Sequence, residues 1–215
     1  MIKIAIALTS DGKHHTRTTI ALMKLHTYIT NNYGAPYIPF SFGRVETSSN
    51  LIVDLMEKKG DVTHILFVDA DADFPEDAIK YLVDADKDII GCNAAMKKSG
   101  DPVLTKDIDG KELNYIKDDI KQVEWIGMHL TLIKMSVFKT IGQPVFYAKP
   151  APGNPKVNSQ DVTFCKNAWY GHNIPTYSHL QLSMSVGHVV WRDTVAYLEP
   201  HIRKQIEAAQ KELKK

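Results

Sequence analysis

Apolar residues in the first 95 positions alternate between short continuous runs and a spacing of three to four residues. The short runs predict strands at 2–8, 37–40, 64–68 and 88–93, with the strand at 37–40 at or near a sheet edge because of Pro39. The helical spacing predicts helices over 16–32, 48–59 and 75–84. Strands that alternate with helices in this way are typical of an α/β protein with a mostly parallel central sheet and helices on its faces.

The second half of the chain has a less regular pattern. Its apolar runs predict strands at 122–125, 131–133, 174–178 and 184–191. Helical spacing predicts helices over 136–141, 159–170 and 193–214. The segments 95–120 and 144–158 are rich in charged residues or in Pro and Gly, which is typical of loops. No linker divides the two halves, so we expect a single domain over 1–215 with its halves at 1–95 and 96–215.

The composition excludes several classes of protein. Of the 215 residues, 44% are hydrophobic and 24% are charged, which are ordinary values for a folded globular protein. Lys and Arg total 26 and Asp and Glu total 25, so the formal net charge is +1. A chain this balanced has no overall field that would attract nucleic acid or an acidic membrane. We therefore expect no nucleic-acid partner.

Three features bear on the location of the protein. The apolar run at 1–8 is shorter than the core of a signal peptide, and no stretch approaches the roughly 18 apolar residues of a membrane helix. The two cysteines, Cys92 and Cys165, are too few for a disulfide framework or a four-ligand zinc site. We therefore expect a cytoplasmic protein with no membrane span and two free thiols.

Three carboxylates leave the end of an apolar run at residues 65–68. They are Asp69, Asp71 and Asp73, and Pro75 follows. Ligands of open α/β sheets bind outside the carboxyl ends of strands, and like charges this close are costly unless a cation lies between them. Carboxylate oxygens suit Mg²⁺ or Mn²⁺. The alternative is a solvated turn in which Asp73 caps the helix that begins at Pro75.

This segment resembles a known family. An apolar strand that ends in Asp69-x-Asp71, about a third of the way along a small α/β chain, is similar to the metal- and nucleotide-sugar-binding motif of GT-A-fold glycosyltransferases. With Phe74 and Pro75 after it, the run resembles the small enzymes of this class that phages and large DNA viruses carry, and in length and order of motifs those of chlorella viruses. The resemblance implies the GT-A fold.

The resemblance also implies a set of metal ligands and a base. Asp69 would reach the ribose or the metal, and Asp71 would bind the metal that bridges the diphosphate. His188, in a Gly-His step before an apolar run, matches a third metal ligand; a buried core histidine is the alternative. Asp161 matches the position that often acts as the base, and it could equally cap a helix. Gln160 stands where many inverting relatives have a second acid, which favours retention.

Two further segments match the binding of the donor. Thr9, Ser10 and Asp11 follow the first strand, where such enzymes hold the base and ribose of the nucleotide. Trp125 and Gly127 lie where relatives have a turn beneath the donor sugar, and an aromatic ring suits the face of a sugar. A tryptophan of the core is the alternative for Trp125. The resemblance makes 1–95 the nucleotide-binding half and 96–215 the acceptor-binding half.

The sequence therefore predicts a metal-dependent hexosyltransferase. It would use Mn²⁺ or Mg²⁺ and a UDP-sugar donor, UDP-glucose by family resemblance, and transfer the hexose to a glycan or protein acceptor. Two alternatives remain open: a metal-dependent nucleotide-sugar hydrolase or nucleotidyltransferase, and a non-catalytic module that binds a nucleotide sugar. The acceptor and the oligomeric state are left open.

Overall fold

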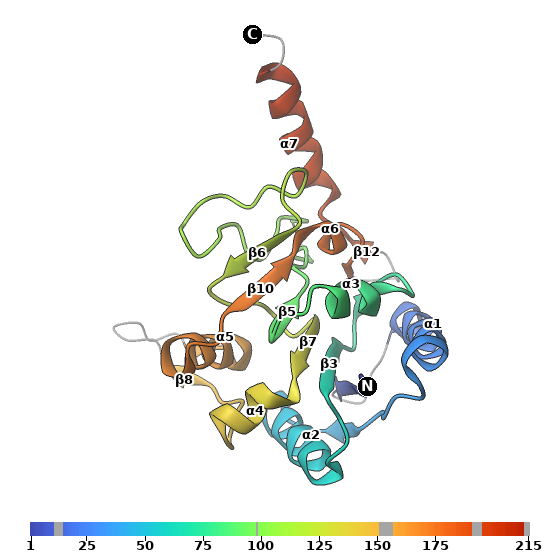
Figure 1. Ribbon diagram of the computed structural model, residues 1–215. Coiled ribbons are helices and arrows are strands. Elements are labelled where there is room, and N and C mark those ends of the chain that lie inside the picture. Colours follow the sequence, from blue (N-terminus) through green and yellow to red (C-terminus); the bar gives the residue numbers. More distant parts are fainter. Residues whose placement is uncertain (11–14, 98, 151–156, 191–194, 213–215) are drawn as a thin grey trace.

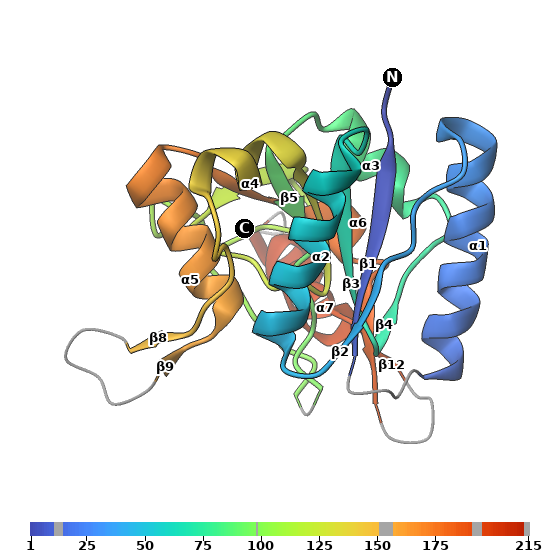
Figure 2. The same cartoon turned by 90° about the horizontal axis from the view of Figure 1, so that it is seen from below.

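The structure is a computed structural model that describes residues 1–10, 15–97, 99–150, 157–190 and 195–212. Within these ranges, a seven-stranded mixed sheet lies at the centre of the molecule and helices cover both of its faces (Figures 1 and 2). Its strands are β1 (Ile4–Ser10), β2 (Phe40–Phe42), β3 (His64–Asp69), β5 (Ile89–Gly91), β6 (Ile120–Val123), β7 (Leu130–Lys134) and β10 (Thr176–His179). Two small sheets hold β4 (Ala72–Asp73), β11 (Gly187–Val189) and β12 (Val195–Ala196), and β8 (Lys149–Pro150) with β9 (Val157–Asn158).

The helices divide between the two faces of the main sheet. Their bounds are α1 (Thr16–Tyr33), α2 (Val45–Lys59), α3 (Ala78–Asp84), α4 (Met135–Ile141), α5 (Gln160–Lys166), the π-helical turn η1 (Asn167–Gly171), α6 (Leu180–Ser183) and α7 (Glu199–Glu212). Helix α1 lies on one side of the sheet, and α2, α4 and α5 lie on the other (Figure 2). The helix α7 extends away from the rest of the molecule (Figure 1). None of the described helices is long and apolar enough to cross a membrane.

The strand order is β2-β1-β3-β7-β5-β10-β6. The pairs β2–β1, β1–β3 and β5–β10 are parallel, whereas β7 runs antiparallel to both β3 and β5, and β6 runs antiparallel to β10. The predicted α/β class is confirmed, but the sheet is more evenly mixed than we expected. A strand that is buried on both faces is apolar along its whole length. Its sequence therefore does not reveal whether it runs parallel or antiparallel to its neighbours.

Two smaller differences have local causes. The apolar run at 37–40 predicted a strand, yet the ladder of β2 begins at Phe40. Tyr37 makes an isolated bridge to Ala5, and Pro39 lacks the N–H that would continue the ladder. The strand predicted at 184–191 is shortened to β11 because the residues before it form α6 and a turn. The helix predicted over 193–214 is α7, and 191–194 and 213–215 lie outside the described residues.

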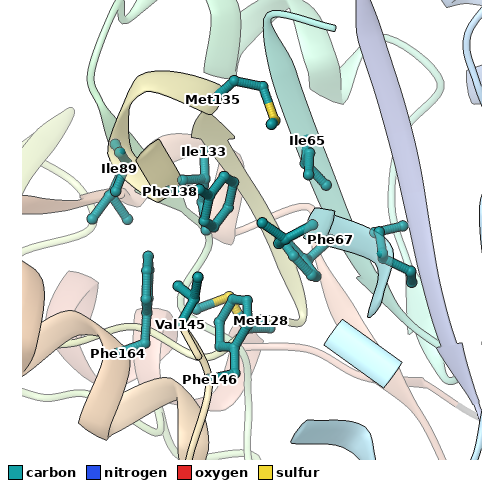
Figure 3. Close-up of a cluster of buried hydrophobic side chains, with 14 of the residues drawn as sticks. Ile65, Phe67, Ile89, Met128, Ile133, Met135, Phe138, Val145, Phe146 and Phe164 are labelled. Atoms are coloured by element: carbon teal, nitrogen blue, oxygen red, sulfur yellow. The ribbon is translucent and has the colours of Figure 1, made fainter. Parts of the chain in front are cut away.

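The core is built from the alternating faces of the central strand β3. Ile65 and Phe67 point to the side of α2, α4 and α5, whereas Leu66 and Val68 point to the side of α1 and α3. Phe67 meets the ring of Phe146 edge-on, with centroids 5.3 Å apart, and a cluster of aromatic and aliphatic side chains continues from there (Figure 3). Burial on both faces holds β3 rigidly and therefore fixes the position of its last residue.

Replacement of Phe67 should test how far the fold depends on this cluster. Phe67 is 1% exposed. We expect Phe67→Ala to lower the free energy of unfolding by about 3–5 kcal/mol, because it removes buried area and leaves a cavity. Urea denaturation followed by circular dichroism measures the change. Ile20→Ala, at a residue that is 49% exposed, is the control and should cost less than about 1 kcal/mol. Equal losses in the two variants would contradict this account of the core.

His64 makes stability dependent on pH. Burial, followed by the positive charge of Lys134, lowers the pKa of His64 below its ordinary value of 6.5. The folded state then binds fewer protons than the unfolded chain just below pH 6.5, so stability should fall as the pH drops through that value. His64→Asn should flatten the decline below pH 6.5, measured by urea denaturation at each pH. The exposed His172→Asn should leave the slope unchanged; an unaltered slope in His64→Asn would refute the assignment.

Candidate metal centre

The end of β3 places the first carboxylate at the edge of the main sheet. Asp69 is the last residue of β3, and its backbone lies beside Thr9 of β1. The chain then turns, and Asp71 lies in this turn before β4 begins at Ala72. The strand ends therefore bring the backbone of Thr9 and Ser10 and both carboxylates to the same edge, as expected for the carboxyl ends of parallel strands.

Pairing between β4 and β11 brings in a histidine from the last part of the chain. Ala72 lies opposite His188, and the N–H of Val189 donates to the carbonyl of Asp71 at 2.7 Å. Because this small ladder continues directly from the aspartate turn, it fixes His188 beside Asp71.

The antiparallel strand β7 brings a second histidine. His129 immediately precedes β7, and its carbonyl accepts a hydrogen bond from the N–H of Asp69 at 3.1 Å. Its side chain is 3% exposed, and its ring centroid lies 3.9 Å from that of His188. Since β7 runs opposite to β3, the start of one strand meets the end of the other at this edge.

Hydrogen bonds fix the tautomer of both histidines. Nδ1 of His188 lies 2.7 Å from the carbonyl oxygen of Ala95, and Nε2 of His129 lies 3.0 Å from that of Gly187. A carbonyl oxygen can only accept, so these two nitrogens carry the protons. The lone pair of each neutral ring is then on the opposite nitrogen, which is the arrangement that metal-binding histidines adopt.

The remaining nitrogen of His129 lies unpaired beside a carboxylate. His129 Nδ1 is buried, has no hydrogen-bond partner and lies 3.6 Å from Asp69 Oδ2. When the ring is neutral both atoms are acceptors, and they attract each other only through a positive charge between them, either a proton on Nδ1 or a metal ion. One ligand atom from each of Asp69, Asp71, His129 and His188 lies within 4.8 Å of the others. These four side chains could hold a metal ion.

The charges of the cluster favour the ligand forms of its members. Burial raises the pKa of Asp69, but the side-chain contact with His129 and the positive charges that His129, His188 and Lys97 carry when protonated outweigh it and lower the pKa overall. Burial, followed by repulsion from His129, lowers the pKa of His188. Asp69 is therefore held as a carboxylate and His188 as a neutral imidazole, the forms in which each binds a metal.

A cavity of about 170 Å³ opens beside the cluster. Asp69, His129 and His188 line one part of it, and Trp125, Gly127 and Asp161 line another. A cavity of this volume is smaller than most ligand pockets, so it suits the reacting end of a ligand rather than a whole nucleotide sugar. A larger hollow of about 490 Å³ lies against α1, but its lining includes Leu8, Leu22, Met23 and Ile38 and no carboxylate.

Asp161 has one carboxylate oxygen engaged and faces the cavity. It lies in the first turn of α5, where Oδ1 accepts hydrogen bonds from Ser159 Oγ and from the N–H of Val162. A Cβ added to Gly127 would lie 3.6 Å from Asp161 Oδ2. Because residue 127 is glycine and has no Cβ, the space in front of Asp161 Oδ2 stays open. Ser159 occupies the N-cap position of α5 without a side-chain capping hydrogen bond, and Asp161 lies two residues further along the helix.

The third carboxylate of the run has a different environment. Asp73 Oδ2 accepts a hydrogen bond from Tyr197 Oη at 2.7 Å and lies 3.5 Å from Arg17 Nη1. Burial, followed by this contact with Asp73, raises the pKa of Tyr197 to about 12. Asp73 thus ties β4 to α1 and to the segment before α7, and it is not among the four side chains of the cluster.

The structure brings together most of the side chains that the sequence singled out. Asp69, Asp71 and His188 converge, and Asp161, Trp125 and Gly127 line the same cavity. The backbone of Thr9 and Ser10, at the end of β1, lies at the same edge of the sheet. Asp11 lies outside the described residues. Sequence reasoning missed His129 and Lys97, whose Nζ contacts Asp71. The sequence feature that could have pointed to His129 is its position directly before an apolar strand.

Comparison with known proteins gives a fold but no family. No family model matches the chain, and no curated protein matches it. The solved structure of A197 from STIV is similar, with a TM-score of 0.62 and 16% identity over 93% of this chain and 91% of that one. The predicted fold class, α/β of the GT-A type, is confirmed.

Two other solved structures are more distant. GalNAc-T7 with UDP, GalNAc and Mn²⁺ has a TM-score of 0.46 and 11% identity, over 83% of this chain and 44% of that one. S. aureus TarS 1-349 in complex with UDP has a TM-score of 0.43 and 13% identity, over 83% and 57%. The chain therefore spans about half the length of these two proteins.

Two aspartates of the run should respond differently to substitution. Asp71→Asn should weaken Mn²⁺ binding at least about tenfold, because it removes a charged ligand. Asp73→Asn should change Mn²⁺ affinity less than about twofold, yet lower the free energy of unfolding by about 1 kcal/mol through its contact with Tyr197. Calorimetric titration with Mn²⁺ and thermal unfolding separate the effects. A loss of Mn²⁺ affinity in Asp73→Asn as large as in Asp71→Asn would show that the cluster has been assigned to the wrong residues.

Proposed function

We propose that this protein is a metal-dependent glycosyltransferase that binds a UDP-sugar and transfers its hexose to a glycan or protein acceptor. One observation carries the proposal. Two carboxylates and two histidines of fixed tautomer converge at the carboxyl edge of a GT-A-type sheet, and Asp161 faces the same cavity. The more specific resemblance, to enzymes of chlorella viruses, rests on the sequence motifs.

The donor would lie across the sheet edge with its diphosphate at the cluster. Asp69, Asp71, His129 and His188 would hold Mn²⁺ or Mg²⁺, which supplies Lewis-acid stabilisation of the leaving diphosphate in place of a general acid. The end of β1 at Thr9 and Ser10, next to Asp69, would receive the nucleoside. UDP-glucose is the donor that the family resemblance favours.

The sugar and the acceptor would meet in the cavity. The indole of Trp125, which packs against two of the core clusters, provides a rigid apolar wall for a sugar face, and Gly127 leaves space beside it. Asp161 Oδ1 is held by Ser159 and Val162, so Oδ2 is the oxygen that would accept a hydrogen bond from the acceptor hydroxyl.

The transfer makes one bond and breaks one. The acceptor oxygen bonds to the anomeric carbon, the bond from that carbon to the diphosphate oxygen breaks, and UDP leaves with the bonding electrons. In an inverting reaction the hydroxyl proton would pass to Asp161 Oδ2. In a retaining reaction, which Gln160 favours, the proton would pass to the leaving diphosphate and Asp161 would orient the acceptor.

Binding and turnover together test this function. We expect UDP and UDP-glucose to bind in calorimetric titrations with Mn²⁺ and to lose that binding in EDTA. Asp71→Ala should abolish metal-dependent binding. Asp161→Asn should keep UDP affinity within about twofold of wild type and lower kcat for transfer about 10²-fold or more, because it removes the base or orienting group.

A matched control and the products decide between the alternatives. Asp109→Ala, at an exposed loop residue, removes the same charge and should change neither quantity. Release of free sugar in preference to transfer with every acceptor would indicate a hydrolase, and formation of a new pyrophosphate bond would indicate a nucleotidyltransferase. Metal-dependent binding of UDP-glucose without any turnover would indicate a binding module. Absence of UDP binding in every condition would refute the nucleotide-sugar proposal.

A further inference from the structure

A lysine from a neighbouring loop already occupies part of the candidate metal centre. Lys97 Nζ forms an ion pair with Asp71 Oδ2, at a side chain that is 18% exposed, while the lysine itself is 52% exposed. Asp71 is one of the four clustered ligands. Lys97 thus places an ammonium group on the carboxylate oxygen, in the position of the cation that the cluster needs.

The loop that carries Lys97 is firmly held at its base. Ala95 and Pro102 form an antiparallel bridge, and the N–H of Met96 donates to the carbonyl of Asp101 at 2.7 Å. The side chain of the buried Asn93 closes the base, since its Oδ1 accepts from the N–H of Leu104 and its Nδ2 donates to the carbonyl of Leu104. The base is therefore fixed, and the lysine extends from it on a flexible stem.

The same loop also orients a ligand. The carbonyl of Ala95, two residues before Lys97, accepts the hydrogen bond from His188 Nδ1 that fixes the tautomer of that ring. One loop therefore presents a carbonyl to His188 and an ammonium group to Asp71. Its residues Val103 and Leu104 line the cavity beside the cluster. The loop that carries Lys97 therefore borders both the metal ligands and the cavity.

We infer that Lys97 is a substitute cation that a metal ion displaces from Asp71 and that then binds the diphosphate of the donor. This inference rests on the proposed function. An ammonium group and a divalent ion repel each other and compete for the single negative charge of Asp71, so metal binding favours release of the lysine. The stem of Lys97 is long and its base is fixed, so its charge stays within reach of phosphate oxygens that approach the metal.

The inference predicts opposite effects on two binding reactions. Without nucleotide, Lys97 competes with the metal, and its removal should tighten metal binding. With metal and nucleotide together, Lys97 neutralises phosphate charge, and its removal should weaken nucleotide binding. A lysine with only a structural role would move neither affinity in this way, and one that simply repels the metal would move only the first.

Calorimetric titration of Lys97→Met with Mn²⁺ alone, and then with UDP at saturating Mn²⁺, tests both effects. We expect Mn²⁺ affinity to rise about threefold, the size of a partly exposed ion pair. We expect UDP affinity to fall at least about tenfold, because a charge-assisted hydrogen bond to phosphate is lost. Lys97→Arg keeps the charge and should retain most of the UDP affinity. Lys111→Met, at an exposed lysine that pairs with Asp109, makes the same change in net charge and should alter neither affinity.

The outcomes separate this inference from the proposed function. Wild-type protein that binds neither Mn²⁺ nor UDP would refute both. Wild-type protein that binds both, with unchanged Mn²⁺ affinity in Lys97→Met, would overturn the competition for Asp71 and leave the proposed function standing. Unchanged UDP affinity in Lys97→Met would overturn the phosphate contact. Thermal unfolding of each variant checks that the fold is intact, which we expect because Lys97 is half exposed.

Discussion

The site depends on one electrostatic constraint: four electron-pair donors, from Asp69, Asp71, His129 and His188, lie within 4.8 Å of one another. Carboxylates repel one another, and the unprotonated nitrogen of a neutral imidazole gains no attraction to a carboxylate, unless a cation lies between them. The fold increases this demand, because backbone carbonyls hold the proton of each imidazole on the side away from the carboxylates. The ion pair of Lys97 with Asp71 meets part of the demand.

Three different features of the fold bring the donors together. Burial of β3 on both faces fixes Asp69, the short β4–β11 ladder places His188 beside Asp71, and the reversed direction of β7 delivers His129 to the same edge. Asp73 secures the arrangement from outside by joining β4 to Arg17 and Tyr197. Neighbouring acids in the sequence thus have different surroundings: Asp69 and Asp71 belong to the cluster, whereas Asp73 links secondary-structure elements.

The sequence predicted the parts of the site that break a pattern. Asp69 and Asp71 stood out because charged residues directly follow a buried apolar run. Their position after a strand predicted that they would lie at the carboxyl edge of the sheet. His188 and Asp161 were recognised only through the resemblance to a family. His129 was missed because its position at this edge follows from the antiparallel direction of β7. The direction of a wholly apolar strand cannot be inferred from its sequence. Lys97 was missed because nothing in a charged loop shows which carboxylate it will contact.

The small sheet of β4, β11 and β12 sets an order of assembly. β4 follows directly on β3, whereas β11 and β12 come from the last part of the chain and pair with it across a long sequence separation. Such contacts form late, since the entropy of the intervening chain must be lost first. A chain still emerging from the ribosome would therefore carry both aspartates but lack His188, and the four-residue cluster would be complete only after synthesis had passed β11.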